Sequence, residues 1–224
     1  MSEFDYAHKN TQTGERATPT AQFNKPVISE SLRKLRENAY SREIPVSDDE
    51  TLNFLGTLLH AVRPQEILEI GTAVGISGTY MLEICENAHL TTIEKNDGFY
   101  AEAADNFLKF GLSSRITAIF GDAGDVLAKL DGQFDFVFLD SAKVQYVKYL
   151  PDIKRLLKSG GILVADDVLL FGYVTGEEEV PKKRKMLVKH IKEYISAVTT
   201  DKELHTTVLD IGNGVALSVK LKNT

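Results

Sequence analysis

Short apolar runs alternate with amphipathic stretches through the middle of the chain. The runs are EILEIG (66–71), LTTIE (90–94), ITAIF (116–120), FDFVFLD (134–140) and GILVADD (161–167). Such dense runs are typical of strands buried on both faces. Helical patterns separate them at 77–86, 97–110, 124–130 and 144–157. The alternation predicts a parallel sheet with right-handed crossovers and helices on both faces.

Other patterns flank this alternation at each end. One helix is predicted from about Val27 to Tyr40, and a second begins at the caps Ser47 and Asp48 and stops before Pro64. A long basic helix is predicted at about 181–198, and the strand patterns after it flank Gly212-Asn213-Gly214 as an antiparallel hairpin. The predicted fold class is therefore α/β, with a mostly parallel seven-stranded sheet that ends in an antiparallel hairpin.

The same patterns predict the domain organisation. Residues 1–25 are polar with few aliphatic side chains, which predicts a flexible tail. Residues 26–224 are expected to form a single domain, made of N-terminal helices (27–63), a core (64–170), and the basic helix with the hairpin (171–224). No period of 20–50 residues repeats, which excludes a solenoid.

Composition narrows the class of protein. Of the 224 residues 43% are hydrophobic, enough for a real core, and the net charge is −6. The single cysteine, Cys85, excludes an intrachain disulfide and fits a reducing cytosol, so we expect a cytoplasmic protein. No run approaches the roughly 18 apolar residues of a membrane span, so no membrane association is expected.

The ends of the first three strands carry candidate cofactor residues, because ligands of open α/β sheets bind at the carboxyl ends of strands. The first strand runs into Gly71 and Gly75, which permit a tight turn, but Ala73 stands where G-x-G-x-x-G needs a glycine. This disfavours a dinucleotide and an NAD-dependent oxidoreductase. The Glu94 carboxylate could accept hydrogen bonds from both hydroxyls of a ribose. Gly121-Asp122-Ala123 could contact the edge of an adenine. A plain strand-to-helix turn is the structural alternative.

The next two strands end in charged residues suited to chemistry. Asp140 is followed by Lys143, and the fifth strand ends in Asp166-Asp167. If these strands are neighbours, three carboxylates and one ammonium meet at one edge of the pocket. Hard oxygen ligands suit Mg²⁺ or a similar dication. The structural alternatives are a helix cap, a loop turn and a surface charge.

The motifs E-I-G-T-A-V-G-I-S, I-E and G-D-A together resemble the class I S-adenosylmethionine (SAM)-dependent methyltransferases, whose fold also ends in an antiparallel hairpin. Within that class the chain is similar to the metal-dependent catechol and caffeoyl-CoA O-methyltransferases, from about Arg42 to Lys220, including I-P-V-S (44–47). The resemblance implies that Glu69 holds the methionine amino end and Glu94 the ribose. The cofactor pocket that it implies consists of Ser47, Glu69, Gly71, Ser77, Glu94, Asp122, Ala123 and Asp140.

The D-x-x-K-x-x-Y pattern at 140–146 and the acids after the fifth strand resemble the metal site of that family. The resemblance implies that Asp140, Asp166 and Asp167 bind Mg²⁺ or Mn²⁺, and that Asp140 and Lys143 are catalytic. The family usually has Asp-Asn where this chain has Asp-Asp, so the site is more anionic. The substrate would chelate the metal through two vicinal oxygens, and Lys143, with a pKa lowered by metal and burial, would take the proton.

A basic stripe bears on the substrate. Lys182, Lys185, Lys189 and Lys192 fall on one side of the predicted helix, opposite an apolar side of Leu187, Ile191, Tyr194, Ile195 and Val198. The structural interpretation is an ordinary solvated helix face. The functional interpretation is a basic surface that binds the phosphates of a nucleic acid. D-D-V-L-L-F-G-Y-V, P-K-K-R-K and V-L-D-I-G-N-G-V-A-L-S resemble bacterial tRNA 5-hydroxyuridine methyltransferases.

This second resemblance implies that the enzyme converts 5-hydroxyuridine in a tRNA anticodon stem-loop to 5-methoxyuridine. The base has vicinal oxygens and can be splayed into a pocket, where Tyr146, Phe171 or Tyr173 could stack on it. The alternative substrate is a small catechol or a caffeoyl-CoA-like phenol. A non-catalytic SAM- or nucleotide-binding module is a more remote alternative. Because the family often forms homodimers, a homodimer is expected.

Overall fold

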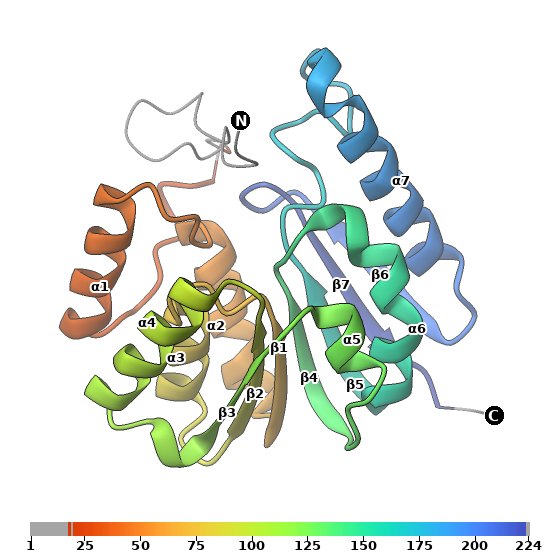
Figure 1. The fold of residues 1–224 in the computed structure, drawn as a ribbon. Coiled ribbons are helices and arrows are strands. Elements are labelled where there is room, and N and C mark those ends of the chain that lie inside the picture. Colours follow the sequence, from red (N-terminus) through yellow and green to blue (C-terminus); the bar gives the residue numbers. More distant parts are fainter. Residues whose placement is uncertain (1–17, 19, 223–224) are drawn as a thin grey trace.

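The computed structural model describes residue 18 and residues 20–222, and its strands form one sheet in the order β3-β2-β1-β4-β5-β7-β6 (Figure 1). Strands β1 to β5 are parallel, β7 is antiparallel to β5, and β6 is antiparallel to β7. This confirms the predicted fold class. The strands are β1 (Glu66–Ile70), β2 (His89–Glu94), β3 (Ile116–Phe120), β4 (Phe134–Leu139), β5 (Leu157–Ala165), β6 (Leu204–Leu209) and β7 (Val215–Lys220).

Helices cover both faces of the sheet. They are α1 (Glu30–Ser41), α2 (Asp49–Val62), α3 (Ile76–Ile84), α4 (Asp97–Lys109), α5 (Ala123–Leu127), α6 (Tyr146–Leu156) and α7 (Lys185–Thr200), with 3₁₀ turns at Ser113–Arg115, Lys143–Gln145 and Lys182–Arg184. Alternate side chains of β4 pack on opposite faces of the sheet. Phe136 and Phe138 pack toward α1–α3, and Val137 and Leu139 pack toward α5–α7. None of the helices in the described part of the chain combines the length and apolar composition of a membrane span.

The helices that flank the central alternation at each end, α1 and α7, begin later than the periodicity predicts. The helix expected from Val27 begins at Glu30, because the Ser29 side chain accepts a hydrogen bond from the Leu32 N–H (3.2 Å). The basic helix expected from 181 begins at Lys185, since residues 182–184 form a 3₁₀ turn after Pro181. Lys182 therefore precedes the helix that carries the other three lysines of the predicted stripe.

The predicted tail lies mostly outside the described residues, which begin at Thr18. The Thr18 hydroxyl donates to Glu50 Oε1 of α2 (2.5 Å), and Asn24 Nδ2 donates to the same oxygen (3.3 Å). Lys25 forms an ion pair with Asp49 at 3.1 Å. The described part of this segment is thus attached to the first turn of α2.

The turn between β6 and β7 braces the segment that leaves β5. The Asn213 carbonyl accepts from the N–H groups of Leu169 (2.8 Å) and Leu170 (3.0 Å), and the Gly214 carbonyl accepts from Val168 (2.9 Å). Leu170 and Phe171 both have left-handed backbone angles (φ 45° and 58°), which non-glycine residues seldom adopt. The hairpin therefore holds a strained segment that follows β5 and the two aspartates after it, Asp166 and Asp167.

We expect Gly214→Ala to destabilise the protein by roughly 2–4 kcal/mol, through its positive φ (94°) and a Cβ only 2.6 Å from the Leu169 nitrogen. Gly160→Ala is the matched control, because Gly160 also has a positive φ (81°) but no heavy atom within 4 Å of the added Cβ. Its cost should be about 1 kcal/mol. Urea denaturation of both variants tests this, and equal losses would contradict the bracing contact.

Candidate active site

The turn between β1 and α3 approaches the end of β4 closely. Gly71 has a φ of 105°, and a Cβ there would overlap the Asp140 carbonyl oxygen. Ala73 adopts a left-handed φ of 45° while its N–H donates to Glu94 Oε2 (2.9 Å). The structure therefore brings together the carboxyl ends of β1, β2 and β4, as the sequence predicts for a ligand site.

Glu69 lies in β1, two residues before Gly71, and is fully buried. Ser77 donates to its Oε1 (2.5 Å) and Thr92 to its Oε2 (2.6 Å). Burial raises the pKa of Glu69, the two hydrogen bonds lower it, and the negative charges of Asp140 and Glu94 raise it, to about 7. A cationic group bound beside Glu69 would favour its ionised form.

The other predicted cofactor residues differ in how firmly the fold holds them. Glu94 is buried, and its Oε1 accepts from the backbone N–H groups of Lys95 (2.9 Å) and Asn96 (2.8 Å). Asp122 is exposed and caps α5 by accepting from the Gly124 N–H (2.9 Å), while Ala123 beside it is buried. The cap is the structural role that Asp122 has in this conformation.

Ser47 enters the site from the N-terminal helices. Its side chain is buried, and its carbonyl accepts from Arg36 Nη2 (3.1 Å), a buried guanidinium that also pairs with Asp49 (2.8 Å). The next residue, Asp48, is close enough to Asp166 that its charge raises the pKa of that carboxyl. The start of α2 therefore lies beside the end of β5.

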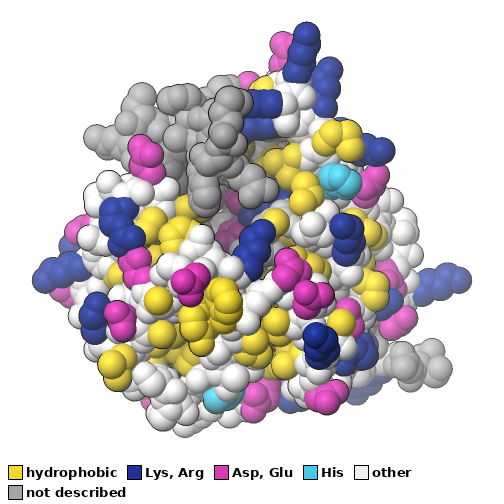
Figure 2. Space-filling view, viewed as in Figure 1, with side chains coloured by type: hydrophobic (Ala, Val, Ile, Leu, Met, Phe, Trp, Pro, Cys, Tyr) yellow, Lys and Arg dark blue, Asp and Glu magenta, His cyan; other side chains and the backbone are white. Residues whose placement is uncertain are grey.

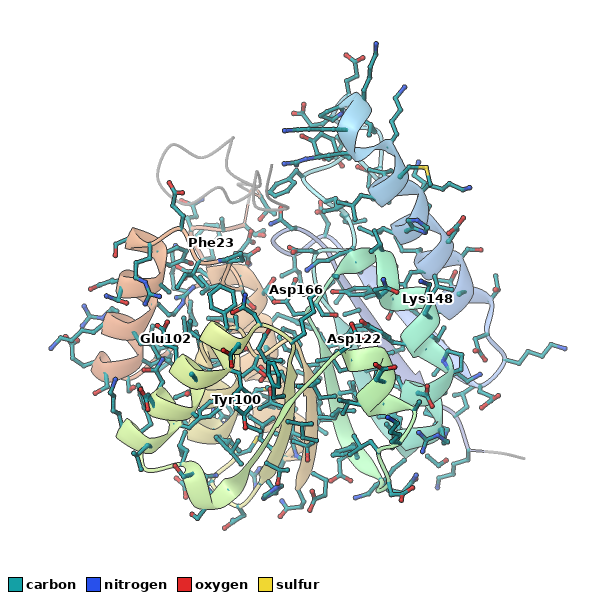
Figure 3. All side chains as sticks on the ribbon, viewed as in Figure 1. Phe23, Tyr100, Glu102, Asp122, Lys148 and Asp166 are labelled. Carbon is teal, nitrogen blue, oxygen red and sulfur yellow. The ribbon has the colours of Figure 1, made fainter. Side chains whose placement is uncertain are left out.

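A lysine and two carboxylates form the centre of the second half of the site. Lys143 Nζ lies 2.7 Å from Asp140 Oδ1 and 2.9 Å from Asp167 Oδ2, and the lysine side chain is only 8% exposed. This is possible because β4 and β5 are neighbours, with Leu139 opposite Ala165. Of the three carboxylates predicted to meet the ammonium, Asp140 and Asp167 contact it, and Asp166 interacts with it through its charge. Figure 3 shows Asp166 between the N-terminal helices and the half of the molecule that carries α6 and α7.

The charges in this cluster set the protonation states. Burial lowers the pKa of Lys143, but the negative charges of Asp140 and Asp167 raise it by more. The pKa of Lys143 is therefore well above its ordinary value. The lowered lysine pKa expected from the sequence requires a bound metal as well as burial, so it stays a prediction for the metal-bound chain. Burial raises the pKa of Asp166, and the charges of Asp167, Asp140 and Asp48 raise it further.

The three predicted metal ligands fit a hard dication in chemistry, although they do not surround a common point in this conformation. The described residues contain no ready-formed cluster of three His, Cys, Asp or Glu side chains. The reason is that Asp140 and Asp167 both turn toward Lys143. Three hard oxygen donors, with more negative charge than one lysine balances, are the donor set that Mg²⁺ or Mn²⁺ prefers.

Of the three aromatic side chains expected to stack on a substrate, one has a different role. Tyr146 is fully buried, its hydroxyl donates to the Leu139 carbonyl (3.0 Å), and its ring lies edge-on to Tyr194 at 5.2 Å. It cannot stack on a substrate, which corrects that expectation. Phe171 and Tyr173 lie 6.1 Å apart, and the Arg184 guanidinium lies 5.5 and 5.6 Å from their ring centres.

Sequence reasoning missed Thr51, which contacts the site directly. Its hydroxyl donates to Asp166 Oδ1 (3.2 Å) from the first turn of α2, 115 residues away in the chain. Thr51 has no motif around it, so no local signal marks it. Asp48 was recognised only as a helix cap, although its charge also reaches Asp166.

The sheet order, the closing hairpin and the acids at the strand ends define a Rossmann-like class I methyltransferase. The model of a family described as O-methyltransferase matches residues 19–221. The chain belongs to this O-methyltransferase family, and it is a SAM-dependent O-methyltransferase of the caffeoyl-CoA O-methyltransferase-like type.

Individual relatives agree with this family. The chain is 30% identical over 211 residues to a caffeoyl-CoA O-methyltransferase of Populus kitakamiensis, covering 88% of each chain. It is 32% identical to a solved structure from Staphylococcus aureus whose name, caffeoyl-CoA O-methyltransferase, is provisional (TM-score 0.79, covering 86% and 93%). The SAH-bound methyltransferase PaMTH1 of Podospora anserina shares the fold at 23% identity (TM-score 0.81, covering 91% and 92%).

Glu69→Gln should change how stability depends on pH. Because the folded-state pKa of about 7 exceeds the unfolded value, the native protein holds the Glu69 proton more tightly. Its contribution to stability is full at low pH and is lost as pH rises through about 7. Relative to the variant, the parent should therefore lose up to about 3 kcal/mol between pH 4.5 and pH 8. Urea denaturation across this range measures the difference, and parallel pH profiles would contradict it.

Proposed function

We propose that the chain transfers the methyl group of SAM, with a bound dication, to 5-hydroxyuridine in a tRNA anticodon loop. The observation that carries the RNA substrate is the position of α7. Its buried face packs against the 3₁₀ turn that contains Lys143, and Tyr194 of α7 contacts Tyr146 just after that turn. A substrate held on the outer face of α7 would therefore lie on an element that packs against the turn carrying the proposed base.

The outer face of α7 suits a polyanion. Lys185, Lys189 and Lys192 line an open groove of about 740 Å³, together with Val188 and Ala197. Lys and Arg side chains gather at the upper end of this helix (Figure 2), in a chain whose net charge is −6. Lys182 does not line the groove. A local basic strip on an acidic protein favours a phosphate-bearing partner over a small neutral phenol.

The residues of the site have separate roles in this proposal. Asp140, Asp166 and Asp167 would hold the dication, which as a Lewis acid lowers the pKa of the acceptor hydroxyl. Lys143 Nζ, which Asp140 and Asp167 hold in place, is the proposed acceptor of the hydroxyl proton. It would accept this proton as the neutral amine, after losing its own proton to solvent when positive charge at Asp140 and Asp167 lowers its pKa. The oxygen then forms a bond to the methyl carbon as the sulfur–methyl bond breaks and its electron pair returns to sulfur. Burial of the lysine keeps water from this step.

A second candidate substrate is a caffeoyl-CoA-like ester. The names of the relatives at 30% and 32% identity favour it. Its catechol ring has the vicinal oxygens that the site needs, and the phosphates of coenzyme A could also contact lysines.

The direct test is transfer of labelled methyl from SAM, with Mg²⁺ or EDTA, into three acceptors: tRNA containing 5-hydroxyuridine, caffeoyl-CoA and a simple catechol. We expect Mg²⁺-dependent label in the tRNA and none in tRNA that lacks the hydroxyl. Label in caffeoyl-CoA alone would replace the RNA substrate with the second candidate. Undiminished transfer in EDTA, with metal-free protein, would contradict the dication.

Charge reversal separates docking from chemistry. The triple variant Lys185→Glu, Lys189→Glu and Lys192→Glu should lower kcat/KM for tRNA at least tenfold, because it removes three contacts to phosphate, and should also weaken the salt dependence. Turnover of a catechol, where the enzyme accepts one, should change less than about twofold.

The matched control reverses three exposed lysines away from α7, namely Lys34, Lys109 and Lys129, with the same change in net charge. It should retain most activity on tRNA. Equal losses in the two triple variants would mean that net charge, and not the face of α7, governs binding.

A further inference from the structure

The Asp166 carboxylate is held on one side only. Asp166 is 2% exposed, and its Oδ1 accepts from the Thr51 hydroxyl (3.2 Å) and from the Asp167 backbone N–H (2.8 Å). Among the described residues, both hydrogen bonds to this carboxylate reach Oδ1 and none reaches Oδ2. The two donors therefore fix one oxygen and leave the other free to bind a cation.

Thr51 is itself held in place by contacts from distant parts of the chain. Its backbone N–H donates to Asp48 Oδ1 (2.7 Å), and Asp48 Oδ2 accepts from the Asn213 N–H in the β6–β7 turn (3.2 Å). A Cβ at Gly212 would overlap the Asp48 carboxylate, so the turn fits closely against this cap. The start of α2, the end of β5 and the hairpin turn thus meet at Thr51, which is fully buried.

We propose that Thr51 is a positioning residue for the dication site, acting through Asp166. This inference rests on the metal-dependent function proposed above. A hydroxyl is suited to the role because it donates to an ionised carboxylate without adding charge to a cluster that already contains Asp140, Asp166 and Asp167. A hydrophobic side chain of the same shape would fill the space but would let the carboxylate turn.

Thr51→Val tests the role, because valine keeps the shape and also the backbone N–H that donates to Asp48. The probe is Mn²⁺ alone, with its binding to the full chain measured by electron paramagnetic resonance. We expect Thr51→Val to weaken Mn²⁺ binding about tenfold, and Thr51→Ser to restore it to within about twofold. In methyl transfer, the Mg²⁺ concentration for half-maximal rate should rise by the same factor, while kcat at saturating Mg²⁺ stays unchanged.

The matched control is Thr79→Val in α3. Thr79 is also fully buried, and within the described part of the chain its hydroxyl has no hydrogen-bond partner. This variant should bind Mn²⁺ like the parent, and all variants should keep similar melting temperatures and SAM affinities.

Two outcomes overturn the proposal in different ways. If the parent binds Mn²⁺ and Thr51→Val binds it equally well, Thr51 has no positioning role and the proposed function stands. If the parent binds no Mn²⁺ at all, the dication of the proposed function is refuted, and the role of Thr51 with it.

Discussion

At the ends of β4 and β5, several carboxylates lie around one buried ammonium, and the surrounding structure must accommodate these charges. Asp140, Asp166 and Asp167 directly follow two adjacent strands, and Asp48, the N-cap of α2, adds a fourth carboxylate. A single buried ammonium, Lys143, contacts two of them. Buried charges are costly unless they are paired, so the metal-free chain holds its lysine protonated and keeps surplus negative charge beside it. A site of this kind has an intrinsic affinity for further positive charge.

Elements distant in sequence converge at this cluster of charges. A backbone N–H of the β6–β7 turn donates a hydrogen bond to the Asp48 carboxylate. Asp48 also caps the helix that carries Thr51. Backbone carbonyls of the same turn accept hydrogen bonds from the N–H groups of the segment after Asp167. Each contact uses a backbone N–H as donor, and the Asp48 carboxylate is the side chain that joins the turn to the helix. The N-terminal helices and the hairpin are therefore structural parts of the chemistry site, although they lie at opposite ends of the sequence.

This dependence also separates what the sequence predicts from what it does not. The strands, the hairpin and the acids at the strand ends follow from short patterns, because sheet topology places the ends of parallel strands at one edge. The start of α1 at Glu30 depends on a single hydrogen bond from the Leu32 N–H to Ser29, which periodicity does not detect. Thr51 contacts Asp166 across 115 residues, so no local pattern could mark it.

The raised pKa of Lys143 was unpredictable for a related reason. Burial alone would lower it, and the outcome depends on the carboxylates that the folded chain places around the amine. The sign of the shift thus follows from distances of 2.7 and 2.9 Å, which spacing along the chain does not supply. The lysine that is proposed to accept a proton is held charged by the same carboxylates that are proposed to bind the dication. The state of Lys143 and the occupancy of these carboxylates are therefore coupled, because positive charge added to Asp140 and Asp167 weakens the interaction that keeps the lysine protonated.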